Sequence, residues 1–472
     1  MTELGTEAAR LESVALTMYA PVDAQIVKTS AGNESTIQIS PRDGTWLMIV
    51  KAPRTYNPKL TSADVANAAL IDLLGSSGLV FDAQQGINRD EIKNIWQTDK
   101  IKSVDDVTGF RGFNGLVQER NKQVTYPNFP EPAEQFFLSI PGKNADPSVR
   151  GFTVVKTGAS QFVVFELLTT ASQFQRVKDI QTVLLHAATI GDPEAIALER
   201  AAAINAGTLL FEKLSNQDFD AIVAASPERW ERRFRPSPTK ATMDEEELGY
   251  RRIKVWKGRR GELNTKANAS RFSEAENQEG YLVRIDARLL ERGDIIDSQS
   301  VFFVTPDRQE EDWTVSLKVQ TMANGRPTGK PQVYTEIGAK RGKKLSVNVT
   351  GGGNGSVIEP LIETNGYISR VESYLLPQVL IRTGLPGDYG FYVFQSDTGN
   401  IRLRRDLVSQ PADRPDAWVI ETRLNEDARK QVSVYTSTGT LISSTLPDGT
   451  AWEPTQLDRL AKLWRTKGLP ME

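Results

Sequence analysis

The sequence predicts an α+β fold: an N-terminal antiparallel sheet packed with helices, then a C-terminal large curved antiparallel sheet or half-barrel with a C-terminal helix. Three observations predict this class. Apolar and polar residues alternate in many short segments that turn residues separate. One long segment, 171–234, has helical periodicity instead. The chain has 472 residues, and since single cores stop growing at about 250–300 residues, we expect two domains.

The first domain opens with a β-meander over residues 11–60, where strands alternate apolar and polar side chains. Residues 61–75 have helical spacing, with Ser62 as the cap and Gly75 as the stop. The last strand before the helical segment, 161–170, carries a nearly continuous apolar run, which is typical of a strand buried on both faces. After the first helix we expect strands in the segments 91–102, 114–127, 134–141, 150–158 and 161–170.

Three helices follow in residues 171–234. The first has its apolar side chains at helical spacing, Pro193 lies in the first turn of the second, and Ser215 begins the third with a pattern that resembles a capping box. The chain then turns to Pro, Ser and dense charge, which is typical of a domain boundary. We therefore assign residues 1–234 to the first domain, 235–246 to a charged linker and 247–472 to the second domain.

The second domain is predicted to be one large antiparallel sheet or an open barrel. Candidate strands recur at intervals of about 8–15 residues, and turn pairs such as Asn324-Gly325 and Thr438-Gly439 separate them. Residues 455–467 form a terminal helix in which Leu460 and Trp464 share one apolar face, so we expect this helix to dock on the sheet.

Composition excludes several classes of protein. The 57 basic and 60 acidic residues give a formal charge of -3, which lacks the positive footprint of a nucleic-acid binder. The absence of Cys removes thiolate catalysis and cysteine-based metal sites, and the single His removes histidine-rich ones. No apolar run reaches the ~18–20 residues of a membrane-spanning helix. We expect no nucleic-acid partner, no transmembrane segment, no metal site and no cofactor.

Several polar motifs have plain structural interpretations. His186 lies near the end of a helix and off its apolar face, so we assign no catalytic residue there. The run Gly351–Gly355 lacks the Lys-Ser/Thr of a P-loop and fits a loop between strands. Acidic residues at 244–247 and 310–312 lack the alternation of a calcium loop, and we expect them to be solvated. We expect the same of the basic clusters at 229–235 and 402–405.

The apolar residues of the second domain are the candidate binding site. The segment Ser373–Leu380 is largely apolar around Pro377, and such a segment could plug the mouth of a half-barrel. Large apolar side chains elsewhere in the domain form either a closed core or the lining of an apolar cavity. The candidate ligand-binding residues are Trp256, Phe302, Trp313, Tyr374, Leu376, Phe391, Tyr392 and Trp418.

Two resemblances to known families rest on the placement of strands and apolar residues. The N-terminal part resembles the PsbP-like α-β-α sandwich proteins of photosystem II, over Leu16–Asp23, Trp46–Ala52 and the run from Gly151 through the helix at Ser172. The C-terminal part resembles the unclosed β-barrel of LolA/LppX-type lipoprotein carriers, over Tyr281–Leu290, Tyr374–Leu380, Asp388–Phe394, Gly439, Asp448-Gly449 and the last helix. These resemblances imply a binding or chaperone role facing the cell envelope, although a fold does not fix a function.

We therefore expect a non-enzymatic protein of a bacterial cell envelope that binds a hydrophobic ligand or a lipidated partner in its C-terminal half-barrel. Its N-terminal domain would dock a partner protein. Two alternatives stay open: a structural or assembly subunit of a larger complex, and a hydrolase that uses paired carboxylates. The N-terminus has no apolar signal core. The protein is periplasmic or extracytoplasmic if Met1 replaces a removed export signal, and otherwise cytoplasmic.

Overall fold

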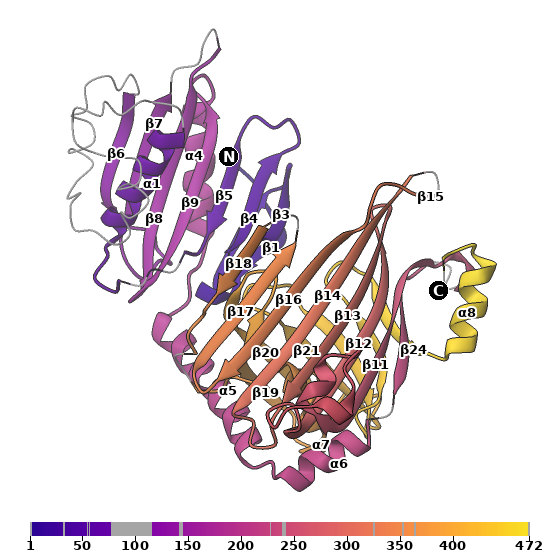
Figure 1. The fold of residues 1–472 in the computed structure, drawn as a ribbon. Coiled ribbons are helices and arrows are strands. Elements are labelled where there is room, and N and C mark those ends of the chain that lie inside the picture. Colours follow the sequence, from indigo (N-terminus) through magenta and orange to yellow (C-terminus); the bar gives the residue numbers. More distant parts are fainter. Residues whose placement is uncertain are drawn as a thin grey trace. The chain divides into compact units, whose positions relative to one another are not determined.

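The computed structural model consists of two compact units, Met1–Arg200 and Ala201–Glu472 (Figure 1). It describes residues 2–31, 34–53, 55, 57–76, 116–140, 145–226, 228–237, 242–323, 326–351, 354–362 and 365–470. Two predicted features, the strand at 91–102 and the turn Asn324-Gly325, lie outside the described residues. The predicted α+β class is confirmed, because each unit combines antiparallel strands with helices.

The first unit has a seven-stranded antiparallel sheet and a separate hairpin. The sheet has the strand order β3-β4-β5-β9-β8-β7-β6. Its strands are β3 (Ala24–Ala31), β4 (Glu34–Pro41), β5 (Leu47–Lys51), β6 (Leu116–Val124), β7 (Ala133–Ile140), β8 (Ser148–Gly158) and β9 (Gln161–Thr170). The hairpin pairs β1 (Leu4–Leu11) with β2 (Leu16–Pro21), and a 3₁₀ turn (Glu12–Val14) joins these two strands.

Helices lie on opposite faces of this sheet. Helix α1 (Ser62–Ser76) contacts β7 and β8, whereas α4 (Phe174–Ala187) contacts β2 and β9 (Figure 1). Strand β9 is therefore buried at every residue from Phe162 to Leu167, as its continuous apolar run predicted. The core on the α4 side combines Phe137, Phe165 and Val177 with the hairpin.

Helices α5 (Pro193–Glu212) and α6 (Asn216–Ala224) confirm the second and third predicted helices. The predicted capping box at the start of α6 is present, since Ser215 Oγ accepts from the Asp218 backbone N–H and the Asp218 carboxylate accepts from the Ser215 N–H. Phe211 of α5 and Phe219 of α6 belong to the core of the second unit. The boundary between the units therefore falls earlier in the chain than the predicted linker at 235–246.

Strand β10 (Arg229–Arg235) also lies, except for its last residue, inside the range 1–234 that we assigned to the first domain. It pairs with β11 (Glu246–Arg259) and β24 (Ala451–Thr455), so it belongs to the large sheet of the second unit. The dense charge of the sequence RWERRFR predicted a solvated segment. Its arginines instead form ion pairs, some of them with neighbouring strands, as Arg232 does with Glu247 at 2.7 Å.

The second unit is built on one large antiparallel sheet that does not close. Fourteen strands follow the path β18-β17-β16-β14-β13-β12-β11-β10-β24-β23-β22-β21-β20-β19, and β15 pairs with β14 off this path. The remaining strands are β12 (Glu279–Glu291), β13 (Asp294–Val304), β14 (Glu310–Ala323), β15 (Arg326–Pro327), β16 (Gln332–Arg341), β17 (Lys344–Gly351), β18 (Asn354–Ile358), β19 (Gly387–Gln395), β20 (Asn400–Ser409), β21 (Ala417–Arg423), β22 (Gln431–Thr436) and β23 (Leu441–Thr445). Short 3₁₀ turns cover Thr242–Asp244, Arg260–Leu263 and Ala269–Arg271.

Helix α7 (Arg370–Arg382) packs into the main core of the second unit and contains the predicted plug segment. Ser369 and Glu372 form a capping box at its first turn, and Pro377 lies inside the helix. The helix contacts β12, β13 and β19, which come from different parts of the sheet. An apolar segment that the sequence placed at the mouth of the barrel is thus one of its core elements.

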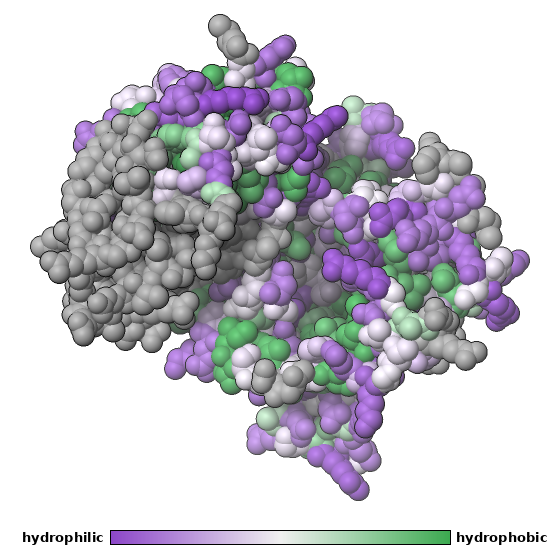
Figure 2. Space-filling view, turned by 90° about the horizontal axis from the view of Figure 1, so that it is seen from above, coloured by the Kyte–Doolittle hydropathy of each residue, from purple (hydrophilic) through white to green (hydrophobic). Residues whose placement is uncertain are grey.

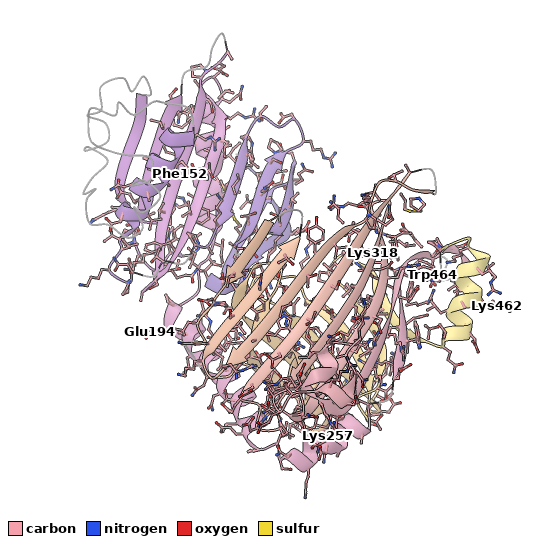
Figure 3. All side chains as sticks on the ribbon, viewed as in Figure 1. Phe152, Glu194, Lys257, Lys318, Lys462 and Trp464 are labelled. Carbon is pink, nitrogen blue, oxygen red and sulfur yellow. The ribbon has the colours of Figure 1, made fainter. Side chains whose placement is uncertain are left out.

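Helix α8 (Leu457–Thr466) packs on the other face of the sheet, as predicted for the terminal helix. Its Leu460 and Trp464 are fully buried against Tyr250. Trp464 lies on the side of α8 that faces the sheet, whereas Lys462 lies on the opposite side (Figure 3). From the side shown in Figure 2, hydrophilic residues cover much of the described surface and apolar residues form patches.

Candidate functional site

Most of the predicted ligand-binding residues lie in a closed core around α7. Phe302, Trp313, Leu376, Phe391 and Trp418 are at most 5% exposed and belong to one apolar cluster with α7. The sequence left open whether these residues form a closed core or line an apolar cavity. At these five positions the structure has a closed core, because α7 fills the concave side of the sheet.

The other three predicted residues differ from these five. Tyr374 stacks on Phe302 and is half-buried. Tyr392 is also half-buried, and its backbone bonds to Gly366 and Ile368. Trp256 belongs to a separate apolar cluster with Leu282, Val301 and Phe303, and its Nε1 donates to Glu262 at 2.8 Å. Successive strand residues point to opposite faces, so Trp256 lies on the face away from the Val255 core position.

A cavity of about 240 Å³ lies beside α7, within the second unit. Its wall comes from Ala225 and Ser226, which follow α6, from α7 and from one sector of the sheet, strands β10 and β11 together with β20 to β24. The curvature of the sheet brings these strands together, although about 150 residues separate β11 from β20 in the sequence. The charged residues in the wall are Arg229, Glu231, Arg251 and Arg404.

The carboxylate of Glu231 bridges two of the arginines. Glu231 is fully buried and accepts from Arg229 Nε at 2.8 Å and from Arg251 Nε at 2.6 Å. Burial acts to raise the pKa of Glu231, but Arg251 and Arg229 outweigh that effect and hold it below its usual value. Glu231 is therefore ionised at neutral pH, and both arginines are held in place at the cavity.

Arg404, on β20, is held in place by Asp406 of the same strand and by Ser373 of α7. Its Nε and one terminal nitrogen donate to the two oxygens of Asp406, at 2.7 and 2.9 Å, and its other terminal nitrogen donates to Ser373 Oγ on α7 at 2.9 Å. Asp406 is fully buried and also accepts from Thr422. Three arginines thus face two carboxylates, which leaves one positive charge at the cavity.

Several polar groups of α7 at this cavity have no partner among the residues that the structure describes. No hydrogen bond joins the Tyr374 hydroxyl to another residue in the described ranges, and burial raises the pKa of this phenol. The buried Oε1 of Gln378 also has no partner among them. Pro377 has no N–H, so the Ser373 carbonyl lacks its partner within the helix. Buried polar groups are nearly always satisfied, and these groups can be satisfied by water or a ligand.

A turn of the sheet closes one side of the cavity. Gly439, in the predicted turn Thr438-Gly439, has a φ of +81° and packs on α7. A Cβ atom at this position would lie 3.1 Å from Gln378 Cα. Glycine is required here both by the left-handed backbone and by the close approach to the helix.

A second polar cluster anchors the N-terminus of α7 and does not line the cavity. Glu311 is fully buried and accepts from the Arg370 backbone N–H at 2.6 Å and from the Tyr367 hydroxyl at 3.0 Å. Burial raises the pKa of Glu311 to about 7, although these two donors oppose the shift. The Arg370 guanidinium donates to Glu336 at 3.0 Å and lies 4.7 Å from the Trp313 ring centroid.

The expectation that the acidic and basic clusters are solvated was wrong at several positions. Glu311 and Glu247 are at most 5% exposed, and Arg232 is 4% exposed. Arg229 and Arg404 line the cavity. Their composition indicated a hydrated face, but their period-two spacing within strands was the signal that one residue in two points inward.

The remaining sequence motifs do not converge on a site. His186 is exposed, and its Nδ1 lies 2.8 Å from the Thr182 carbonyl oxygen of the same helix. Within the described ranges, no group of three or more His, Asp or Glu side chains is arranged to hold a metal ion. Of the described residues that line the cavity, Glu231 is the one carboxylate, so no carboxylate pair faces it. None of the described helices combines the length and the apolar character needed to cross a membrane.

Comparison with known proteins gives no family. No protein-family model matches the chain, and no curated protein sequence matches it. Similar solved structures include a β-barrel-like protein of a domain of unknown function, DUF1849, from Brucella abortus. Its sequence is 12% identical, the match covers 49% of this chain and 97% of that chain, and the TM-score is 0.30. Cyanobacterial PsbP from Synechocystis is 10% identical; the match covers 40% of this chain and 94% of PsbP, with a TM-score of 0.25. The Ran-binding protein Mog1p from Saccharomyces cerevisiae is 10% identical; the match covers 41% of this chain and 98% of Mog1p, with a TM-score of 0.25.

These likenesses bear on the two resemblances only in part. A PsbP protein is among the similar structures, whereas a likeness of the second unit to LolA-type carriers is not shown. TM-scores of 0.30 and below carry no argument about function. The case for a function therefore rests on the cavity and its residues.

Proposed function

We propose that this protein is a non-enzymatic binding protein whose second unit holds a small ligand in the cavity beside α7. The observation that carries this proposal is the wall of the cavity, where polar groups, above all the hydroxyl of the half-buried Tyr374 and the buried Oε1 of Gln378, have no partner in the described part of the chain. A bound molecule that supplies these partners would lower the cost of burying them.

The geometry favours a small ligand over the acyl chain that the sequence indicated. A long acyl chain would need the concave face of the half-barrel, and α7 fills that face with side chains such as Leu376 and Val379, which are at most 1% exposed. Displacing α7 would expose a core that includes Trp313 and Phe391. A location in the cell envelope stays part of the proposal, and cell fractionation with an antibody against the chain tests it.

Native mass spectrometry of the full chain, purified under mild conditions from its native source, tests the proposed function. We expect a bound small molecule that organic solvent releases. Ile420 lines the cavity and is 2% exposed, so Ile420→Phe should fill part of the cavity and remove the bound mass. Val419→Phe is the matched control, since Val419 is the neighbouring residue on the other face of the same strand. A ligand that stays bound to the Ile420→Phe protein would place binding elsewhere.

A second candidate, an assembly subunit, is favoured by one surface feature. Val333 and Ile337 of β16 and Val357 of β18 are 54%, 54% and 64% exposed. The register places Ile337 opposite Asn348, and Asn348 opposite Val357, so the three apolar side chains share one face of the sheet. Light scattering coupled to size-exclusion chromatography, on the wild type and Ile337→Ser, would show whether copies of the chain associate through this face. Docking of a partner by the first unit is likewise a proposal, which a pull-down with that unit tests.

A further inference from the structure

The cavity has a cationic end that the described residues do not fully neutralise. Arg229 and Arg251 share the single carboxylate of Glu231, and Asp406 neutralises Arg404. Nearby, Arg251 lies over the Trp452 ring, 4.2 Å from its centroid, which holds the guanidinium in the cavity wall without cancelling its charge. A partly buried positive charge without a counterion is costly, and an anion would offset that cost.

The two arginines keep N–H groups available for a ligand. The Glu231 carboxylate accepts hydrogen bonds from Nε of Arg229 and from Nε of Arg251, and it also pairs with one terminal nitrogen of Arg251. Neither terminal nitrogen of Arg229 bonds to another residue in the described part of the chain, and the same holds for the second terminal nitrogen of Arg251. A guanidinium presents five N–H donors in a planar fork that matches carboxylate and phosphate oxygens.

The rest of the wall combines apolar side chains with neutral polar ones, and the volume is small. Ile253, Leu380, Ile420 and Leu441 line the cavity beside the polar groups. The volume of the cavity is about 240 Å³. It lies below the range of about 300–1,000 Å³ that drug-sized ligands occupy. The wall therefore suits a small organic molecule with one negatively charged group and a body that contacts these apolar side chains.

We propose that the ligand of this cavity is a small organic anion whose carboxylate or phosphate group is bound by Arg229 and Arg251. This inference rests on the proposed function, since it names the class of ligand for the same cavity. The Tyr374 hydroxyl is placed to donate a further hydrogen bond to the anion, and the apolar side chains contact the body of the ligand.

Calorimetric titration of the full chain tests this inference with four probes of similar size: benzoate, phenyl phosphate, benzyl alcohol and benzylamine. Benzoate or phenyl phosphate should bind, and the stronger of the two identifies the acidic group. Benzyl alcohol and benzylamine should bind at least about tenfold more weakly, because the alcohol carries no negative charge to pair with two arginines and the protonated amine repels them.

Substitutions at neighbouring positions of β11 provide the matched pair. Arg251→Gln should weaken binding of the anionic probe about tenfold or more. Arg252→Gln should leave it unchanged, since Arg252 lies on the other face of the strand and pairs with Glu228 at 2.7 Å. Arg229→Gln, at a second lining position, confirms the effect independently if Arg251→Gln alters the fold, which circular dichroism reports.

The outcomes separate this inference from the proposed function. If benzyl alcohol binds as tightly as benzoate, and Ile420→Phe abolishes both, the cavity binds ligands but the assignment of an anion is overturned. Anion binding that neither Arg251→Gln nor Arg229→Gln weakens overturns it as well. Failure of all four probes also overturns it, and a native ligand found by mass spectrometry in that case would leave the binding function intact.

Discussion

Replacing the buried carboxylate of Glu311 by an amide should change how the stability of the second unit depends on pH. Glu311 is fully buried, and its pKa is raised from the usual 4.5 to about 7, mainly by burial. The folded protein therefore holds this proton more tightly than the unfolded chain does. The contribution of Glu311 to stability is fully present below pH 4.5 and is lost as the pH rises through about 7.

The magnitude follows from the two pKa values. One pH unit corresponds to about 1.36 kcal/mol, so the displacement from 4.5 to about 7 is worth about 3 kcal/mol. Glutamine has nearly the same shape and does not ionise; its amide oxygen can accept from the Arg370 N–H, and its amide N–H can donate to the Tyr367 hydroxyl oxygen. Glu311→Gln should therefore gain about 3 kcal/mol relative to the wild type between pH 4.5 and pH 8.

Urea unfolding of both proteins at several pH values, followed by tryptophan fluorescence, measures this difference. Glu310→Gln is the control, because Glu310 is the neighbouring residue, 36% exposed, in ion pairs with Arg260 and Arg341. Such partly exposed pairs contribute about 0–1 kcal/mol. Parallel stability curves for the wild type and Glu311→Gln over this pH range would refute the reasoning that Glu311 is buried without full compensation.

Three further predictions concern stability, each read from urea unfolding of the full chain. Gly439→Ala should destabilise the second unit by about 1–3 kcal/mol and by more than Gly449→Ala, because both glycines have a φ near +80° but a Cβ meets other atoms only at Gly439. Trp464→Ala should cost about 3–5 kcal/mol, while Leu457→Ala on the same helix, 44% exposed, should change stability by less than about 0.5 kcal/mol. Ser369→Ala removes the capping box of α7 and should cost about 0.5–2 kcal/mol; no loss in this variant would contradict the role of the cap in seating α7.

The sequence by itself determined the local elements of this protein. Alternating patterns predicted antiparallel strands throughout, and the continuous apolar run at 161–170 predicted a strand buried on both faces. Capping residues and helical spacing predicted α6 at Ser215 and the terminal helix with Trp464 on its buried face. These features depend on residues close together in the chain, so their signal is present in short windows of sequence.

The tertiary structure alone decided where the units divide and what the charged segments do. The strand RWERRFR has the composition of a linker, and only its pairing with β11 and β24 shows that it is central to the sheet. The cavity combines Arg229 and Arg404, which are far apart in the sequence and come together because the sheet curves.

The role of the predicted apolar ligand-binding residues was also decided by the tertiary structure alone. The sequence placed Trp313 and Phe391 in one domain, but it left a lined cavity and a filled core as alternatives. Helix α7 decides between them by packing into the main core of the second unit, so that these residues become core and the cavity beside them is lined in part by arginines. The physical reason is that burial and charge compensation depend on contacts between distant segments, which a one-dimensional pattern does not contain.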